Sequence, residues 1–469
     1  SPSLRGIWRS GRPGRRAFLS RALLPAAAAL LAGCLRSAPT GCNVVLVTID
    51  TLRADHLSCY GYTRPTSPFI DSLASKGTLF RRASSTSPWT PPALASIFTS
   101  LHPRSHGVNR GYVDAAGGKV LGQEQLAPGL AVIAEHLARN GYDTFGISSN
   151  LHMTAATGFS RGFLRFSGLG VGRAAAVNRV FRELLPEIGG GRPYFLWIHY
   201  FDPHDPYFAC RPWIANYNPA KASWSRYAGK TMPKLLGMID EIKSDPGALS
   251  ALRDLYDSEI NYTDDHLRAL VEALPGLDRT VLIVTSDHGE EFLERGGLGH
   301  GSSLFEEQVR VPLIIVPPGA PPAVGEVAGA VSVVDIFPTI CAAAGVAPPA
   351  GLQGRSLLPL MDGAPPEGDR AILAELNRAG PDRRQASLRR GDWKFVRGAG
   401  EADGCALYDL VRDPEEKRNL AREEASRAAR MEGELEEWRK AHPAFAAPPS
   451  GGPLGERETK QLRSLGYLN

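Results

Sequence analysis

The chain has 469 residues, of which 43% are hydrophobic and 22% charged. This composition excludes a disordered chain and provides enough apolar residues for a large core or two packed units. The formal net charge is +4, but six arginines and no acidic residue precede Cys34, so the rest of the chain is nearly neutral. A neutral surface gives no electrostatic reason to expect nucleic acid as a partner.

Residues 1–34 have the pattern of a targeting signal, with a basic region, a short apolar run and small residues. The stretch RRAFL (15–19) resembles a twin-arginine export signal, and LAGC (31–34) resembles a lipobox that would make Cys34 a lipidated residue. A plain amphipathic anchor or an uncleaved signal is the alternative. We therefore expect a bacterial envelope protein, periplasmic or on the outer surface, attached to the membrane through Cys34.

Five short runs rich in β-branched and aromatic residues predict strands, at 44–49, 144–147, 194–200, 281–285 and 313–316. Helical stretches separate them, among them 130–140, which Gly141 would terminate. This alternation predicts an α/β domain around a mostly parallel sheet. The remaining cysteines (Cys42, Cys59, Cys210, Cys341 and Cys405) are widely spaced, which favours isolated thiols over a zinc site and leaves a disulfide open.

The stretch SPWTPPALASIFTSL (87–101) predicts a helix with one buried face, because Leu94, Ile97, Phe98 and Leu101 recur at helical spacing. Thr90 would lie at or beside the N-cap. It is then either a helix cap or a nucleophile in the positive potential of a helix N-terminus, whose free N–H groups would cradle an anion.

Farther along, residues 205–254 are aromatic and irregular, which indicates a lid or substrate-facing excursion, with a surface subdomain as the alternative. Residues 413–442 alternate charges at helical spacing and predict a solvated helix. We divide the chain into a signal segment (1–34), a catalytic domain (43–347) and a C-terminal subdomain (348–469).

Polar residues follow four of the predicted strands. Asp50 follows the first, 148–150 the second, His199 and Asp202 the third, and Asp287 with His288 the fourth. Ligands of open α/β sheets bind at the carboxyl ends of strands, so these groups can converge. Mixed carboxylate and imidazole ligation suits a divalent cation, which Asp50, Asp287 and His288 would hold.

Several ordered blocks resemble sulfatase-like members of the alkaline phosphatase superfamily. They are VVLVTIDTLRADHLSCYGY (44–62), HYFDPHDPY (199–207), 256–264, 286–290, HGSSLFEEQVRVP (300–312), 407–420 and 461–467. The resemblance implies a mostly parallel sheet flanked by helices and a smaller C-terminal α+β subdomain with a short antiparallel sheet. It also implies one divalent cation (Ca, Mg, Mn or Zn), with Asp50, Asp287 and His288 at the positions of metal ligands and Thr90 at that of the nucleophile.

The chain departs from typical sulfatases at this site. Their C/S-x-P-S-R motif, which yields formylglycine, is replaced by TPPAL (90–94), a basic block by GISSN (146–150), a lysine by His300 and a second aspartate by Thr51. No formylglycine is therefore expected. A threonine resembles the phosphotransferase branch of the superfamily, in which a hydroxyl attacks phosphorus.

These observations predict a metal-dependent hydrolase or transferase acting on phosphate or sulfate esters of a small molecule, lipid or glycan. Thr90, which would also contact the metal, would be the nucleophile; His204 and His300 would bind oxygens or protonate the leaving group; and Asn150 would help to bind the substrate. The alternatives are a sulfuric ester hydrolase without formylglycine and a non-catalytic envelope binding lipoprotein. His199 and Asp202 are compatible with a second metal or a supporting role, and Arg53 with bracing through Asp55.

Overall fold

The computed structural model describes residues 41–110, 112–114, 120–217, 224–319, 322, 324–365, 369–377, 384–398, 404–445 and 459–460. The predicted signal segment with Cys34 and the block 461–467 lie outside these residues. None of the helices in this part of the chain combines the length and apolar character that a membrane span requires. All five cysteines in it are free thiols, and Cys210 and Cys341 are buried, as expected of isolated thiols.

The largest element is a sheet that has nine strands within the described residues. In spatial order these are β11 (Arg310–Val311), β2 (Thr78–Ser84), β12 (Leu313–Val316), β8 (Thr280–Ser286), β1 (Asn43–Ile49), β7 (Tyr194–Tyr200), β5 (Asp143–Ser148) and β6 (Arg165–Gly168), with β13 (Glu326–Ser332) beside β2. Strands β8, β1, β7, β5 and β6 are parallel to one another, and β12 is antiparallel to β8 and β2. All five predicted strands are present, each within one residue of its predicted bounds.

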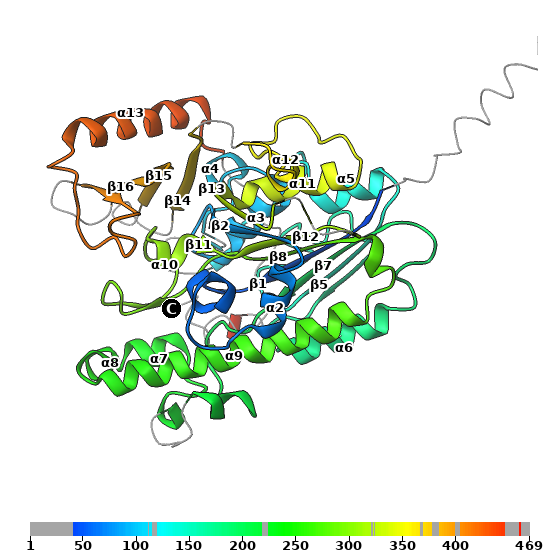
Figure 1. Ribbon diagram of the computed structural model, residues 1–469, viewed down its shortest axis with the longest axis horizontal. Helices are drawn as coiled ribbons and strands as arrows, with labels where there is room; N and C mark the ends of the chain where they lie inside the picture. Colours follow the sequence, from blue (N-terminus) through cyan, green and yellow to red (C-terminus); the bar gives the residue numbers. More distant parts are fainter. Residues whose placement is uncertain are drawn as a thin grey trace, which may run out of the picture. The chain divides into compact units, whose positions relative to one another are not determined.

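Helices cover both faces of this sheet (Figure 1). In β1, Val45 and Val47 belong to one apolar cluster, and Val44 and Leu46 to the other. Residues of α2 (Pro68–Ala74), α6 (Ala174–Leu184) and α9 (Pro246–Glu272) complete the first cluster, and residues of α3 (Thr90–Thr99), α5 (Ile133–Arg139) and α11 (Ile336–Ala343) complete the second. The central strands are therefore apolar without alternation, as expected for a parallel sheet buried on both faces.

Two of the predicted helices are present in altered form. The helix expected at 130–140 is α5, followed by Gly141 in the left-handed region at φ 92°. The helix after Thr90 is α3, but all ten of its residues are buried, so the prediction of a single buried face was wrong. The reason is tertiary: α3 packs against α4 (Pro103–His106), α5 and α11 in addition to the core beneath it.

The segment 205–254 is irregular only in its first half. It contains the short turns η3 (Trp213–Asn216) and η4 (Trp224–Arg226), and then α7 (Met232–Leu236), α8 (Ile239–Ser244) and the start of α9. Asp245 caps α9 by accepting a hydrogen bond from the Gly247 N–H at 2.8 Å. Tyr227, Leu235 and Ile242 belong to the first apolar cluster, together with residues of α2, α6 and α9, so these turns and helices pack against the core.

The C-terminal part forms a four-stranded antiparallel sheet of β14 (Ala371–Asn377), β15 (Arg384–Arg390), β16 (Trp393–Arg397) and β17 (Cys405–Asp409). Helix α13 (Ala425–Ala441) packs on it through Ala428, Met431 and Leu435. The prediction of a solvated helix over 413–442 was thus wrong in two respects: the helix begins at Ala425, and one of its faces is buried. The buried face consists of apolar residues at i, i+3 and i+7, which lie between charged residues in the sequence. The predicted α/β core with a smaller C-terminal subdomain is confirmed.

The remaining short elements connect these layers. They are η1 (Ala54–His56), η2 (Ser58–Tyr60), β3 (Tyr112–Asp114), β4 (Val120–Gln123), η5 (Leu277–Arg279), β9 (Glu291–Phe292), β10 (Leu298–Gly299), α10 (Glu306–Val309), η6 (Val333–Asp335) and α12 (Leu358–Met361).

Candidate active site

The predicted site residues converge at one edge of the sheet. Strands β8, β1, β7 and β5 are parallel neighbours, and Ile49 pairs with both Ser286 and Tyr200 at their ends. The next residues along each strand therefore leave the sheet side by side. Asp50, Asn150, Asp287 and His288 all lie there, buried from solvent.

Asp50, Asp287 and His288 form a compact group in which one potential ligand atom of each lies within 4.8 Å of the others. His288 Nε2 is 3.5 Å from Asp50 Oδ1 and 3.4 Å from Asp287 Oδ2. Its Nδ1 lies 2.9 Å from the carbonyl oxygen of Gly289, which can only accept, so Nδ1 carries the proton and Nε2 presents a lone pair to the group. Asp287 Oδ2 is buried and has no hydrogen-bond partner among the described residues.

The electrostatics of this group favour a cation. Burial and the neighbouring Asp50 carboxylate raise the pKa of Asp287. Burial also opposes ionisation of Asp50, but the charges of His204 and of the adjacent His199 hold its pKa below the usual range. Two adjacent buried carboxylates, one with an unpartnered oxygen, and an imidazole lone pair fit a divalent cation such as Ca, Mg, Mn or Zn.

Thr90 is the first residue of α3, and its side chain does not cap the helix. The N-cap is Trp89, and no side-chain hydrogen bond caps this end. Instead, Thr90 Oγ1 lies 3.4 Å from Asp50 Oδ1 and 3.2 Å from His288 Nε2. The structure thus brings the hydroxyl against Asp50 and His288, two members of this group, which the capping interpretation does not explain.

The expected cradle of free N–H groups at this helix end is largely missing. Pro91 and Pro92 have no N–H to donate. The N–H of Ala93 donates to the carbonyl of Trp89 at 3.4 Å. The first turn of α3 therefore offers fewer N–H donors than expected, and its part in holding the oxygens of an anion stays a prediction.

Two histidines lie beside this group. The rings of His300 and His288 have centroids 4.5 Å apart, and those of His300 and His204 are 4.8 Å apart. His204 Nδ1 lies 2.7 Å from the carbonyl oxygen of Asp205. Burial disfavours the charged ring, but the charges of Asp205 and Asp50 outweigh it and raise the pKa of His204. A histidine whose charged form is favoured at this place can bind an anion or donate a proton.

Glu290, which sequence reasoning missed, orients His300. Its Oε1 lies 3.1 Å from His300 Nδ1, and the carboxylate is fully buried. Burial, followed by the charges of Asp205 and Asp50, raises the pKa of Glu290 well above its usual range. The signal that could have found it is its position in SDHGE (286–290), directly beyond the predicted ligands.

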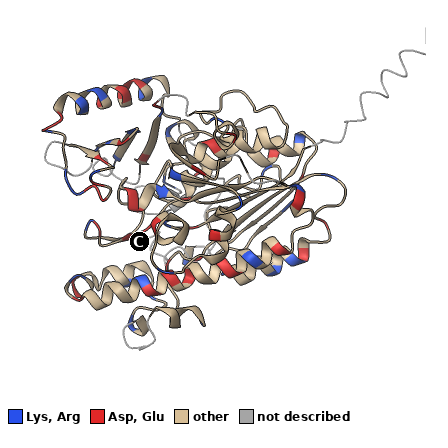
Figure 2. Ribbon diagram, in the orientation of Figure 1, with Lys and Arg blue, Asp and Glu red and all other residues tan. Residues whose placement is uncertain are grey.

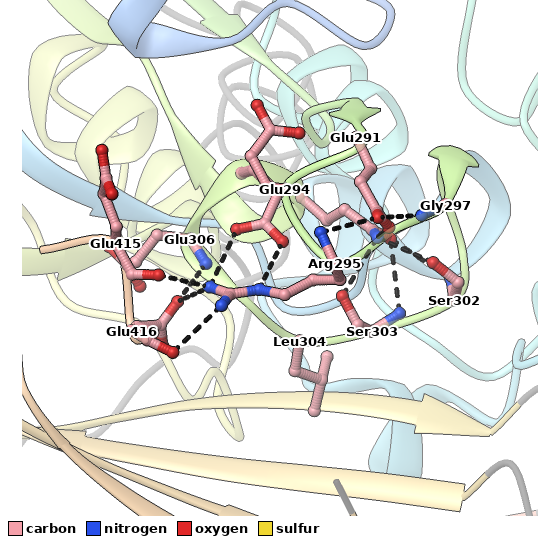
Figure 3. Close-up of polar contacts among 12 residues, drawn as sticks. Glu291, Glu294, Arg295, Gly297, Ser302, Ser303, Leu304, Glu306, Glu415 and Glu416 are labelled. Carbon is pink, nitrogen blue, oxygen red and sulfur yellow. Dashed lines mark hydrogen bonds and ion pairs between the residues drawn. The ribbon is translucent and has the colours of Figure 1, made fainter. Parts of the chain in front are cut away.

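Hydrogen bonds of the Gln308 side chain fix the loop that carries His300, and they are among the contacts drawn in Figure 3. Gln308 Nε2, which has two N–H groups, lies within hydrogen-bond distance of the hydroxyls of Ser302 at 2.8 Å and Ser303 at 3.0 Å and of Glu291 Oε2 at 3.2 Å. Gln308 Oε1 also accepts from the N–H of Ser302 at 3.2 Å. This single amide therefore limits the positions that His300 can take.

The sequence also did not indicate that the backbone of Thr51 is strained. Its φ is 56°, a left-handed value that is unfavourable for a β-branched side chain. The Thr51 N–H donates to Asp287 Oδ1 at 3.3 Å, and its carbonyl accepts from the hydroxyl of Tyr256 at 2.7 Å. The strained turn thus aims a backbone donor at a predicted metal ligand. Thr51 Oγ1 is buried without a hydrogen-bond partner among the described residues.

Asn150 and His199 both contact Asp50. Asn150 Nδ2 donates to Asp50 Oδ2 at 2.8 Å, so one of the two N–H groups of its amide is bound to a predicted metal ligand. The role of Asn150 in substrate binding stays a prediction. His199 Nε2 is 3.4 Å from the same oxygen, and its Nδ1 is 2.8 Å from Thr48 Oγ1. Both residues hold the Asp50 carboxylate in place.

Asp202 and Arg53 have supporting roles. Asp202 accepts from Arg173 Nε at 2.8 Å and from the Ala174 N–H at 2.7 Å, and so fixes the start of α6. Arg53 forms a two-bond pair with Asp55, at 2.9 and 2.7 Å, and donates to the carbonyl of Glu290 at 2.8 Å. The bracing expected of Arg53 is observed, and the contacts of Asp202 are those of a supporting role.

Comparison with known proteins places this site in a family. Residues 42–346 match the family model described as Sulfatase, and residues 300–441 match N-sulphoglucosamine sulphohydrolase, C-terminal. The chain therefore belongs to the sulfatase family, within the alkaline phosphatase-like superfamily. This membership confirms the resemblance predicted from the sequence and the expectation of an ester-hydrolase family.

Particular relatives resemble parts of the chain. Arylsulfatase K of Mus musculus is 35% identical over 190 residues, which are 37% of this chain and 33% of the relative. Arylsulfatase K of Rattus norvegicus is 24% identical over 81% of this chain and 75% of the relative. Choline-sulfatase of Rhizobium meliloti (strain 1021) is 29% identical over 49% of this chain and 46% of the relative. The first and third matches thus span less than half of those relatives.

Solved structures share the fold at low identity. A phosphonate monoester hydrolase of Agrobacterium radiobacter superposes with a TM-score of 0.68 at 24% identity, covering 86% of this chain and 96% of that one. A protein solved with its substrate D-glucosamine-2-N,6-O-disulfate has a TM-score of 0.70 at 18% identity, covering 86% and 98%. At this identity the likeness establishes the fold.

Proposed function

We propose that this protein is a metal-dependent ester hydrolase or transferase whose nucleophile is the Thr90 hydroxyl, acting on phosphate or sulfate esters through a covalent intermediate. The observation that carries the proposal is the position of Thr90 Oγ1, 3.4 Å from Asp50 Oδ1 and 3.2 Å from His288 Nε2. Threonine cannot be converted to formylglycine, yet its hydroxyl lies against two of the predicted metal ligands. A residue that only began a helix would not need that contact.

The residues of the site have separate roles in the proposed reaction. A divalent cation held by Asp50, Asp287 and His288 would lower the pKa of a nearby hydroxyl and neutralise charge on the ester. Thr90 Oγ1 forms a bond to phosphorus or sulfur and passes its proton toward Asp50 Oδ1, which accepts its hydrogen bond. The bond to the leaving oxygen breaks, and His204 or His300 donates a proton to that oxygen. Water or another alcohol then gives its proton to that histidine and attacks the same phosphorus or sulfur, and the bond to Thr90 Oγ1 breaks as this oxygen takes back its proton from Asp50.

Two other functions remain as candidates. A sulfuric ester hydrolase without formylglycine is favoured by the relatives, which are named arylsulfatase and choline-sulfatase. The neighbour named phosphonate monoester hydrolase supports phosphorus chemistry in the same fold. A non-catalytic envelope binding lipoprotein is disfavoured by the unpartnered Asp287 Oδ2 and by the two histidines, which a chemically silent site does not require.

The test measures turnover of matched aryl sulfate, phosphate monoester and phosphate diester substrates by the full chain with Ca, Mg, Mn or Zn. We expect cation-dependent turnover, and a loss on the order of 10³-fold or more in Thr90→Ala. Thr99→Ala, at the other end of α3, is the matched control and should retain turnover. Turnover of every substrate by Thr90→Ala at the wild-type rate would refute the nucleophile assignment, turnover of sulfate alone would favour the sulfuric ester hydrolase, and silence on all three would favour the binding protein.

We also propose that the chain is anchored in a bacterial envelope through a lipidated Cys34, on the support of LAGC (31–34) alone. Cells supplied with labelled palmitate should label the wild-type chain and not Cys34→Ala, and the variant should leave the membrane fraction. Unlabelled wild-type protein in the soluble fraction would contradict the anchor.

A further inference from the structure

A cavity of 330 Å³ lies where β2, β11 and β13 of the large sheet meet β15 of the C-terminal sheet. The charged residues of its described lining are four arginines and two glutamates: Arg81, Arg82, Arg310, Arg389, Glu306 and Glu326. Figure 2 shows acidic residues on α10, which carries Glu306, and basic residues on the strands beside it. None of these lining residues belongs to the candidate active site, so the cavity is a separate place in the molecule.

The arginines of this cavity reach from the surface into the protein. The side chains of Arg81 and Arg82 are 34% and 35% exposed, whereas that of Arg389 is 6% exposed. Arg389 donates from Nε to the carbonyl of Gly391 at 3.2 Å and from Nη1 to Glu306 at 3.4 Å. Its Nη2 makes no hydrogen bond within the described residues. A small anion can therefore enter from solvent and meet a buried guanidinium group with a free donor.

Arg310 has no counterion among the described residues. Its one hydrogen bond to them runs from Nη2 to the carbonyl of Arg81 at 3.3 Å, and its Nε is buried without a partner. Burial lowers the pKa of Arg389, and the charges of Arg82 and Arg310 lower it further, although Glu306 opposes this. A buried N–H without a partner costs free energy, and neighbouring guanidinium groups repel each other. An anion between these arginines removes both costs.

The carboxylates nearby do not balance Arg310, because each has a salt bridge to another cation. Glu306 lies 2.9 Å from Lys394, and Glu326 lies 2.9 Å from Arg81. Arg310 also lines a neighbouring cavity of 540 Å³, whose other carboxylates are paired in the same way. Those pairs are Asp55 and Glu294 with Arg53, Glu307 with Arg295, and Glu415 with Lys417. Among the arginines and lysines of the two described linings, Arg310 is the one without a salt bridge to a described residue.

We propose that this cavity binds a doubly charged tetrahedral oxyanion, sulfate or phosphate, between Arg82, Arg310 and Arg389, either as the free ion or as the charged group of a larger molecule. Guanidinium groups bind such oxygens through paired N–H donors. The lining has four positive and two negative side chains, so a doubly charged anion balances it. Arg82 also contacts Asp392 at 2.6 Å, but this pair is at the surface and contributes little stability that would hold Arg82 away from the anion.

The bound anion joins β11 of the core to β15 of the C-terminal sheet, because Arg310 and Arg389 come from these two strands. The site does not depend on the reaction proposed for Thr90.

The test is isothermal titration calorimetry of the full chain without divalent cations, at an ionic strength held constant with NaCl. The titrants are sodium sulfate, sodium phosphate and glucose 6-phosphate. Arg310→Gln removes the unpaired charge, and Arg82→Gln, at a more exposed position, is a second variant that disturbs folding less. The matched control is Arg253→Gln, an arginine that lines only the neighbouring cavity and is 38% exposed. His300→Ala reports on anions bound in the candidate active site.

We expect sulfate and phosphate to bind at least about tenfold more weakly to Arg310→Gln than to the wild type, because charge-assisted donors are lost, and also more weakly to Arg82→Gln. Arg253→Gln and His300→Ala should keep this site at wild-type affinity. Glucose 6-phosphate that binds as tightly as phosphate would identify the charged group of a larger molecule as the ligand, and binding of the inorganic ions alone would identify the free ion.

Three results would overturn the proposal. The first is that the wild type binds none of the three titrants over the chloride background. The second is equal affinity of the wild type and both arginine variants. The third is binding that only His300→Ala abolishes, which would assign the anion to the candidate active site.

Discussion

The chemistry of the candidate site depends on the direction of a few single side chains. Thr90 turns its hydroxyl away from the helix end and toward Asp50 and His288. The proton on His288 Nδ1 is committed to the Gly289 carbonyl, which leaves Nε2 as a ligand atom. Asp287 Oδ2 is buried with no hydrogen-bond partner among the described residues. All three directions suit a bound cation, and the unpartnered Asp287 Oδ2 costs free energy without one, because buried polar atoms need partners.

At this scale we predict the effect of Asp287→Asn on cation binding. The substitution removes one of two neighbouring buried carboxylates, so the cation-free variant should melt at the wild-type temperature or above it. The stabilisation that a cation adds, about 2.7 kcal/mol at a hundredfold excess over Kd, should largely disappear. Melting curves with and without cation measure both effects. Asp278→Asn, at an exposed position before β8, is the control, and an undiminished cation effect in Asp287→Asn would refute the ligand assignment.

Among the elements, α3 carries Thr90, the proposed nucleophile, and this helix is fixed by contacts on every side. Its Ser96 Oγ lies 3.1 Å from His106 Nε2 in α4, and His106 Nδ1 accepts from the Val108 N–H at 3.1 Å. The ring is therefore neutral, with its proton on Nε2. Burial lowers the pKa of His106 to about 3. This histidine joins α3 to α4 only in its uncharged form.

The stability of this contact should depend on pH. An unfolded histidine takes up a proton near pH 6.5, whereas folded His106 does so only near its pKa of about 3. The contribution is therefore complete above about pH 6.5 and is lost as the pH falls toward 3, by roughly 1 kcal/mol per pH unit. Urea unfolding at pH 7 and pH 5 should show a smaller fall in His106→Gln than in the wild type. Equal falls would show that His106 is not the group responsible.

Over the whole molecule, buried charges join the catalytic core to the C-terminal sheet. Lys394 Nζ, on β16, lies 2.9 Å from a carboxylate oxygen of Glu306 in α10 and 2.9 Å from one of Glu416. Arg295 pairs with Glu307 and donates to the carbonyls of Glu415 and Glu416 (Figure 3). Both networks border the loop that carries His300. The C-terminal subdomain therefore supports the candidate site from outside it.

For this junction we predict that Lys394→Met is strongly destabilising. It leaves the buried carboxylates of Glu306 and Glu416 without the ammonium group that they share, and only the longer contacts to Arg389, 3.4 Å from Glu306, and to Arg295, 3.7 Å from Glu416, stay. We expect a loss of about 3 kcal/mol. Chemical denaturation measures the change, and the double variant Glu306→Gln/Lys394→Met should recover part of it. A loss of less than about 1 kcal/mol in the free energy of unfolding would mean that the ion pairs of Lys394 do not hold the C-terminal sheet to the core.

Much of the fold follows from local patterns in the chain. The five predicted strands and α5 are present because long apolar runs and a terminating glycine are properties of neighbouring residues. Asp50, Asp287 and His288 could also be predicted together, because each follows such a strand and parallel strands align their carboxyl ends. Sequence therefore determined the α/β class, the edge at which the site lies and the residues able to hold a cation.

The tertiary structure alone decided how these residues are used. It buried α3 on all sides, hid the apolar stripe of α13, turned the Asn150 amide toward Asp50 and placed Glu290 behind His300. The partners of Thr90 are 40 and 198 residues away in the chain, so no local pattern describes them. The burial and direction of a side chain depend on segments that are distant in the chain, whereas hydrophobic periodicity depends on neighbouring residues. For this physical reason the sequence predicted the strands and the ligand positions, and only the tertiary structure decided the contacts of the site.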